Sequence, residues 1–179
     1  MVALGIPAAD FYLPDTITGR TVHLEEVKGS PATVIMFICN HCTFVKHVNE
    51  QLVKLAGDYL DKGVAFIAIS SNDVENHPED SPERMKEWAE RLGYNFPYLY
   101  DESQEVARVY QAACTPDFFI YDNGMKLAYR GQLDDSRPGN DIPVTGKDIR
   151  EALDCLLAGM PVPAEQRPSI GCNIKWKKD

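Results

Sequence analysis

Residues 33–42 read TVIMFICNHC, and this stretch decides the fold of the chain. Its first six residues are almost entirely apolar, which predicts a buried strand over residues 33–38. Apolar residues at helical spacing follow, which predicts a helix over residues 42–60. A strand that passes through Cys39-x-x-Cys42 into a helix is expected to bring the first sulfur, that of Cys39, to the helix N-terminus, where free N–H groups and the helix dipole favour a thiolate. The stretch therefore points to redox chemistry.

The totals of the sequence limit the class of protein. The 179 residues predict one domain over residues 1–179 with a proper hydrophobic core. The net charge of −9, from 18 basic and 27 acidic residues, argues against nucleic-acid and anionic-membrane partners. The first residues carry no secretory signal and no segment approaches membrane-spanning length, so we expect a cytoplasmic location. Five cysteines are an odd, small number that does not suggest a disulfide scaffold.

The pattern downstream predicts an α/β arrangement. A second apolar run at residues 64–69 forms a βαβ unit with the first strand, and the two strands are therefore expected to be parallel. Ser81 and Pro82 predict the start of another helix. A short strand near residues 96–100 and a short helix near residues 103–110 come next.

The second half of the predicted sheet is antiparallel. Two strand-like runs at residues 118–121 and 125–130 flank Asn123-Gly124, which predicts a hairpin with a type I′ turn. The polar segment 131–146 is long for an unstructured loop, which suggests a functional role. A helix with Thr145 as N-cap ends at Gly159, and a tail follows.

This order of elements, together with Thr115-Pro116 far downstream, resembles the thioredoxin-like superfamily. Three segments are more specific: FICNHC at residues 37–42, CTPDFF at residues 114–119 and GCNIKWK at residues 171–177. They are similar to the redoxin (AhpC/TSA-type) branch, and within it to a peroxiredoxin-like group that carries C-x-x-C. The resemblance implies a central mixed sheet flanked by helices, with a redoxin-type N-terminal extension and a C-terminal tail. It also implies a cis Pro116 opposite the two cysteines, with Thr115 offering backbone groups to an incoming peptide.

The sequence departs from these families at informative positions. That group usually has proline after the second cysteine, where this chain has Thr43. Peroxiredoxins use P-x-x-x-T-x-x-C, and the corresponding positions before Cys42 hold Ile35 and Cys39. Their active-site arginine also has no counterpart near Phe118, so the groups that activate a peroxide are not expected here.

The candidate catalytic residues are Cys39, His41, Cys42, Thr115 and Pro116. We expect Cys39 to be the exposed nucleophile and Cys42 the resolving thiol, with exchange through a mixed disulfide on Cys39. A protonated His41 between the thiols would favour the thiolate; the alternative is a solvated residue at the helix start.

Three further residues are possible accessories. Cys114 is either a third redox thiol or a buried packing residue. Cys172 either folds back as an extra resolving cysteine or pairs with nothing. Arg137 either reaches the site or is solvated.

The sequence favours a thiol–disulfide oxidoreductase that acts on protein or small-molecule disulfides and thiols, with no cofactor and no metal. One alternative is a peroxiredoxin-like thiol peroxidase and antioxidant in which Cys42 is oxidised by peroxides. A second alternative is a carrier of copper bound by Cys39, Cys42 and a nearby histidine. The sequence gives no oligomeric state.

Overall fold

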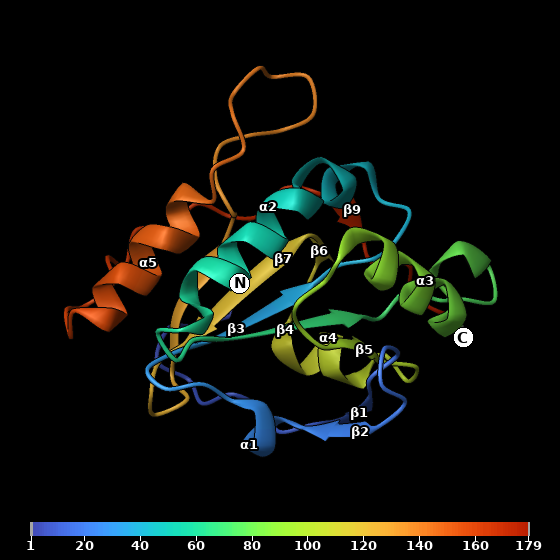
Figure 1. Cartoon of the computed structure of the whole chain (residues 1–179), viewed down its shortest axis with the longest axis horizontal. Helices are drawn as coiled ribbons and strands as arrows, with labels where there is room; N and C mark the ends of the chain where they lie inside the picture. Colours follow the sequence, from blue (N-terminus) through green and yellow to red (C-terminus); the bar gives the residue numbers. More distant parts are fainter. Residues whose placement is uncertain (1, 179) are drawn as a thin grey trace.

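A mixed five-stranded sheet forms the centre of the computed structural model, which describes residues 2–178 (Figure 1). The strand order is β5-β4-β3-β7-β8. The strands β3 (Thr33–Phe37), β4 (Ala65–Ser70) and β5 (Tyr98–Tyr100) are parallel, whereas β7 (Asp117–Tyr121) and β8 (Leu127–Gly131) are antiparallel. The parallel and antiparallel halves meet at β3, which leads directly into Cys39.

Helices cover both faces of this sheet. The helices α2 (Thr43–Leu60), α3 (Pro82–Leu92) and α5 (Lys147–Leu157) share one hydrophobic core with Val34 and Met36 of β3. Side chains alternate along a strand, so the next residues of β3 face the opposite side. The chain is therefore a thioredoxin-like α/β fold, as the resemblance implied.

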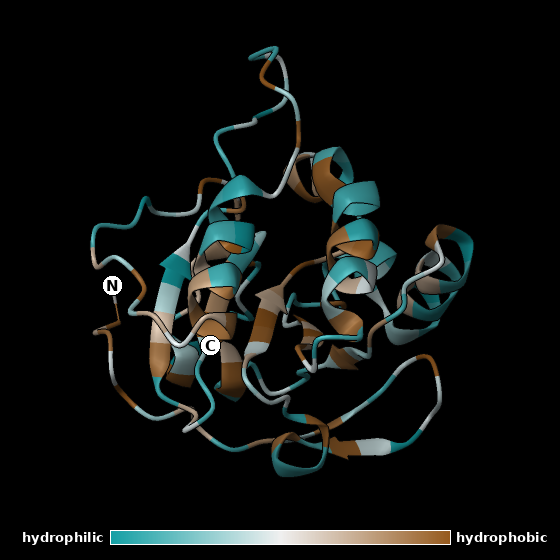
Figure 2. Cartoon of the chain, turned by 60° about the vertical axis from the view of Figure 1, so that its left-hand side comes forward, coloured by the Kyte–Doolittle hydropathy of each residue, from teal (hydrophilic) through white to brown (hydrophobic). Residues whose placement is uncertain are grey.

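The opposite face is covered by α4 and the N-terminal segment. Ile35 and Phe37 pack there in a second core with residues of α4 (Glu105–Tyr110) and of the N-terminal extension. In that extension β1 (Tyr12–Pro14) and β2 (Thr21–His23) form a small antiparallel hairpin. The short helix α1 (Leu24–Val27) follows directly. In Figure 2 the central strands are largely hydrophobic, while the helices carry hydrophilic segments.

The hairpin between β7 and β8 differs from the prediction. A type I′ turn needs positive φ at Asn123 and Gly124, but in this turn only Met125 has it, with φ of 58°. The reason is Asp122, whose Oδ1 accepts hydrogen bonds from the backbone N–H groups of Gly124 and Lys126, at 3.0 Å each. This side chain holds a different turn and places the left-handed residue one position later.

The start of α5 also differs slightly. Gly146, with φ of 72°, is the N-cap, and the Thr145 hydroxyl accepts from the backbone N–H of Lys147 at 3.3 Å. Ser81 caps α3 as expected, accepting from the Arg84 N–H at 3.3 Å. Before that helix lies the short 3₁₀ helix η1 (Pro78–Asp80).

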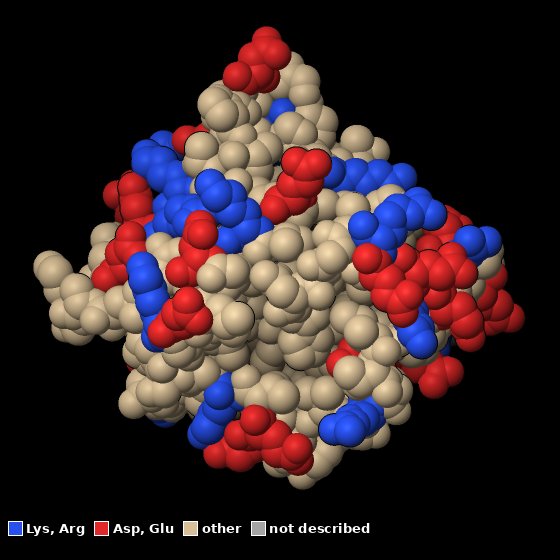
Figure 3. Space-filling view, viewed as in Figure 1, with Lys and Arg blue, Asp and Glu red and all other residues tan. Residues whose placement is uncertain are grey.

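The C-terminal tail returns to the middle of the fold. Its strand β9 (Cys172–Asn173) pairs antiparallel with β6 (Cys114–Thr115), the segment that precedes Pro116 (Figure 1). Through residues 2–178, the structure contains no helix that is long and apolar enough to cross a membrane. Figure 3 shows acidic side chains gathered over α3, and basic and acidic groups interspersed on the rest of that face.

Candidate active site

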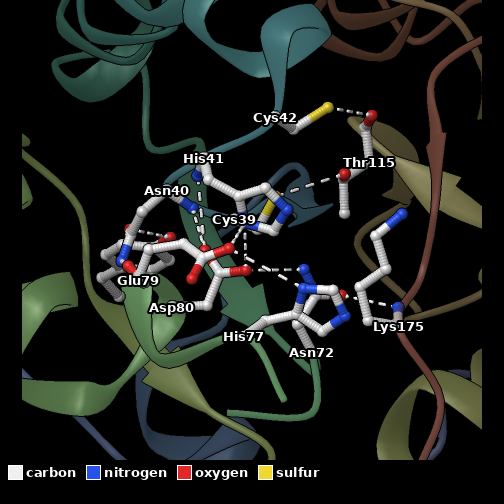
Figure 4. Close-up of polar contacts among 11 residues, drawn as sticks. Cys39, Asn40, His41, Cys42, Asn72, His77, Glu79, Asp80, Thr115 and Lys175 are labelled. Carbon is white, nitrogen blue, oxygen red and sulfur yellow. Dashed lines mark hydrogen bonds and ion pairs between the residues drawn. The ribbon is translucent and has the colours of Figure 1, made fainter.

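The two cysteines lie where β3 passes into α2, and Cys42 is the N-cap residue of that helix. Opposite them is Thr115, which is joined to Pro116 by a cis peptide bond, as the resemblance implied. Figure 4 shows that Cys39 and Cys42 both point toward Thr115. The fold therefore brings residues 73 or more positions apart in the sequence into one site.

Thr115 contacts both sulfurs. The Cys39 Sγ lies 3.5 Å from the Thr115 Oγ1, and the Cys42 Sγ lies 3.3 Å from the Thr115 carbonyl oxygen. Cys39 and Cys42 are each only 1% exposed. The expectation that Cys39 is exposed is therefore wrong, because the site is covered in this structure.

A buried carboxylate organises the loop that carries Cys39. Asp80, which is fully buried, accepts through Oδ1 from the backbone N–H of Asn40 at 2.8 Å and of His41 at 3.3 Å. Its Oδ2 accepts from the Asn72 Nδ2 at 2.9 Å. Backbone N–H groups must find partners when they are buried, and Asp80 supplies them.

His41 faces this carboxylate. Its Nδ1 contacts the Asp80 Oδ2, and its ring stacks on that of His77 with 5.6 Å between ring centroids (Figure 4). Glu79 lies 3.7 Å from both imidazoles. His41 thus bridges the cysteine loop to an acidic segment. A nitrogen of its ring also lies within 4.8 Å of the Cys39 sulfur.

The surroundings of Cys39 favour the neutral thiol, whereas those of Cys42 favour the thiolate. The pKa of Cys42 is lowered, because its thiolate accepts first from the Cys39 thiol and then from neighbours that include Cys172, Thr115 and the Val45 N–H. The pKa of Cys39 is raised, because its proton is held against Cys42, its side chain is buried and the Asp80 charge is nearby. These groups place the thiolate on Cys42, at the N-cap position.

Of the three possible accessories, the structure brings Cys172 into the site. Cys172 is directly opposite Thr115 in the β6–β9 pair, and it packs against the hydrophobic cluster that contains Cys39 and Cys42. Its side chain is half-buried.

Cys114 and Arg137 lie outside the two-cysteine site. Cys114 lines a separate pocket with Asp117, and burial followed by the Asp117 charge raises its pKa to about 12. Arg137 donates from Nη1 to the carbonyl oxygens of Asp134 at 2.7 Å and Ser136 at 2.8 Å, and it therefore braces the long polar loop.

Two groups of side chains have the composition of metal ligands. Cys39, His41 and Asp80 form one group, and His41 with His77 and Glu79 forms the other. The ligand atoms in each group lie within 4.8 Å of one another. The copper alternative requires Cys39 and Cys42 as ligands together. Among the described residues, neither group contains Cys42.

Residues 4–130 match the AhpC/TSA family. The chain belongs to the AhpC/TSA family. This matched region contains the sheet strands β3, β4, β5 and β7, both cysteines of the pair and the cis-proline segment.

This AhpC/TSA chain is similar along its whole length to a solved structure. An uncharacterized conserved protein from Geobacillus kaustophilus is 65% identical, with a TM-score of 0.98 over 100% of this chain and 95% of that one. A thiol:disulfide interchange protein DsbE from Chlorobium tepidum, described as putative in its structure, shares the fold at 18% identity. Its TM-score is 0.69, over 88% of this chain and 99% of that one.

The curated relatives of this AhpC/TSA chain are thiol–disulfide oxidoreductases named ResA. The ResA of Halalkalibacterium halodurans is 28% identical over 106 residues, which is 59% of this chain and 55% of the relative. The chain thus spans little more than half the length of that relative.

Sequence reasoning missed the residues that hold the site together. Asp80, Asn72 and Gln104 lie in polar stretches without periodicity, and their burial is set by tertiary contacts. Pro78 and the Ser81 cap were the available signals, since they show that the chain turns tightly around Asp80.

Proposed function

We propose that this protein is a thiol–disulfide oxidoreductase that works through a reversible Cys39–Cys42 disulfide. The observation that carries the proposal is the convergence of both sulfurs on Thr115, with the thiolate favoured on Cys42. Thiolates perform disulfide exchange, and a second thiol at this spacing can resolve the mixed disulfide. The names of the ResA relatives support the same activity.

In this proposal Cys42 is the sulfur at which the pair exchanges with its partners. The sequence suggested Cys39 for that role, but the interaction between the two cysteines raises the pKa of Cys39 and lowers that of Cys42, and burial of Cys39 and the nearby Asp80 charge act on Cys39 in the same direction. In the reduced state the Cys42 thiolate attacks a disulfide and releases one thiolate. Cys39 then gives up its proton, attacks the Cys42 sulfur and releases the second thiol. One disulfide is reduced and one is formed.

The neighbourhood of His41 offers room for part of a substrate. A cleft of about 450 Å³ beside His41 is lined by Lys46, Trp88 and Arg91, among others. Protein or small-molecule disulfides are therefore the proposed substrates. The apolar ring and the mixed charges suit a peptide-like chain rather than a purely apolar ligand.

A redox titration in glutathione buffers tests the proposal. Thiol alkylation followed by peptide mass spectrometry should show a reversible Cys39–Cys42 disulfide with a potential between roughly −120 and −270 mV. C39S and C42S should each abolish it. Oxidation of Cys42 to a sulfenic or sulfinic acid by peroxide, with no disulfide to Cys39, would contradict the proposal and support the peroxidase alternative.

A further inference from the structure

Strand β9 covers the edge of β6 beside the redox pair. Thr115 pairs with Cys172 and Cys114 with Asn173, and the Ile174 N–H donates to the Ala113 carbonyl at 3.3 Å. The approach is close: a Cβ on Gly171 would lie 2.1 Å from the Thr115 carbonyl oxygen. Glycine at this position lets the tail backbone reach the cis-proline segment.

The tail is fixed on the far side of the site as well. The Lys175 N–H donates to the Asn72 Oδ1 at 2.9 Å, and the Lys175 carbonyl accepts from the Asp73 N–H at 2.8 Å and the Gln104 Nε2 at 2.9 Å. Asn72 also donates to Asp80, so the tail and the cysteine loop share one buried hydrogen-bond network (Figure 4). Cys172 is therefore held beside Cys42 by contacts on both sides.

Exposure separates the three thiols of this cluster. Cys39 and Cys42 are 1% exposed, whereas Cys172 is half-buried and reaches the surface. Of the three cysteines, Cys172 is therefore the residue most open to a disulfide or thiol that arrives from solvent.

We propose that Cys172 is a third catalytic cysteine, which relays exchange between the buried Cys39–Cys42 pair and external thiols or disulfides. This relay rests on the proposed function. It requires a Cys42–Cys172 disulfide as an intermediate.

The relay proceeds through three exchanges, and atoms and electrons balance in each. In the oxidised protein the Cys172 sulfur attacks the Cys42 sulfur; the Cys42–Cys172 bond forms, the Cys39–Cys42 bond breaks, and the proton of Cys172 passes to Cys39. An external thiol then attacks Cys172 and loses its proton to solvent, and Cys42 leaves as a thiolate. A second external thiol attacks the mixed disulfide on Cys172, which releases the external disulfide and returns Cys172 to a thiol. Two external thiols are oxidised and one protein disulfide is reduced; the reverse sequence reduces an external disulfide.

The intermediate can be trapped in the C39S variant. Treatment of the folded C39S protein with oxidised glutathione should give a Cys42–Cys172 disulfide, identified by alkylation and peptide mass spectrometry. C39S/C172S should instead retain glutathione on Cys42. C39S/C114S is the matched control and should still form the link, because Cys114 is the neighbour of Thr115 but lines a different pocket. Glutathione retained on Cys42 of C39S, with Cys172 free, would overturn the relay.

The rate at which the Cys39–Cys42 disulfide is reduced tests the role of Cys172 in exchange. Reduced glutathione should reduce the Cys39–Cys42 disulfide at least about tenfold more slowly in C172S and C172A than in wild type, because an intramolecular partner is replaced by a dilute external thiol. C114S should match wild type. Equal rates in wild type, C172S and C172A would contradict the relay.

The peptide mass spectrometry and the rate measurement together separate this inference from the proposed function. Absence of the Cys39–Cys42 disulfide in oxidised wild type would count against the oxidoreductase itself. Its presence, combined with unchanged rates in the Cys172 variants, would overturn the relay alone.

Discussion

The Asp80 Oδ1 lies 2.8 Å from the backbone nitrogen of Asn40, inside the loop between the two cysteines. The residues are forty positions apart, and the carboxylate is fully buried. It accepts from two backbone N–H groups and the Asn72 amide and contacts the His41 ring. Asp80 therefore has two roles: it accepts the hydrogen bonds that hold the cysteine loop, and it places a negative charge near Cys39.

Replacing Asp80 should therefore destabilise the fold. We expect D80A to lower the free energy of unfolding by about 3 kcal/mol, since it leaves buried donors without a partner. Urea unfolding measures this. E79A is the control, because Glu79 is the exposed neighbour on the same 3₁₀ helix, and it should cost no more than about 0.5 kcal/mol. Equal midpoints for D80A and E79A would show that Asp80 does not hold the loop.

The reduced protein should carry about one thiolate per chain at neutral pH, and that thiolate should belong to Cys42. C42S should remove the ultraviolet absorbance of the thiolate. C39A should move its appearance to higher pH, because the hydrogen bond from the Cys39 thiol is the largest contribution to the lowered pKa of Cys42 and alanine cannot donate one. C114S should leave the titration unchanged. A neutral-pH thiolate that survives in C42S and disappears in C39A would instead restore the order suggested by the sequence.

The sequence was a good guide to the central fold because its signals are local and periodic. The apolar runs before Cys39 and at residues 64–69 became β3 and β4, each shifted by no more than one residue at its ends. Thr115-Pro116 was also found correctly, and lies opposite the pair with a cis bond. The two strands follow from apolar runs that the sequence carries directly, whereas the cis-proline follows from the resemblance to thioredoxin-like proteins.

The strand β9, which pairs with β6 beside the two cysteines, could not be predicted in the same way. Strand β9 has two residues, too few to show an alternating pattern, and its partner is 57 to 59 positions away. Likewise, nothing local marks Asp80 as buried, since charged residues are seldom buried unless they find partners elsewhere in the fold. Cys172 and Asp80 therefore needed the tertiary structure.

Asp117 should make stability depend on pH. Burial raises its pKa from 3.8 to about 6. The folded state then binds more protons than the unfolded state between these values, so this contribution is fully present below about pH 4 and is lost as pH rises through about 6. The total is about 3 kcal/mol.

The comparison of D117N with wild type measures this contribution. Asparagine keeps an acceptor for the Ala113 N–H, which lies 3.2 Å from the carboxylate, but does not ionise. D117N should gain stability relative to wild type as pH rises from about 4 to 6. D141N, in an exposed loop, controls for the loss of a negative charge. A constant difference between D117N and wild type over this range would rule out the linkage.

The same substitution, glycine to alanine, should have opposite effects at two positions. At Gly171 a Cβ would meet the Thr115 carbonyl oxygen at 2.1 Å and its carbon at 2.7 Å, and backbone cannot move aside cheaply. G171A should cost about 1–3 kcal/mol and accelerate hydrogen exchange of residues 172–174, because β9 must separate from β6.

At Gly57, within α2, the nearest group to a Cβ is the Asn95 Nδ2 at 3.5 Å, an ordinary contact. G57A should therefore stabilise the protein by about 0.5–1 kcal/mol, through helix propensity and a less flexible unfolded chain. Unfolding curves and native-state hydrogen exchange of both variants test the pair. Unchanged exchange at residues 172–174 in G171A would mean that the tail does not need its close approach to Thr115, and that β9 is less tightly coupled to the redox site than the contacts indicate.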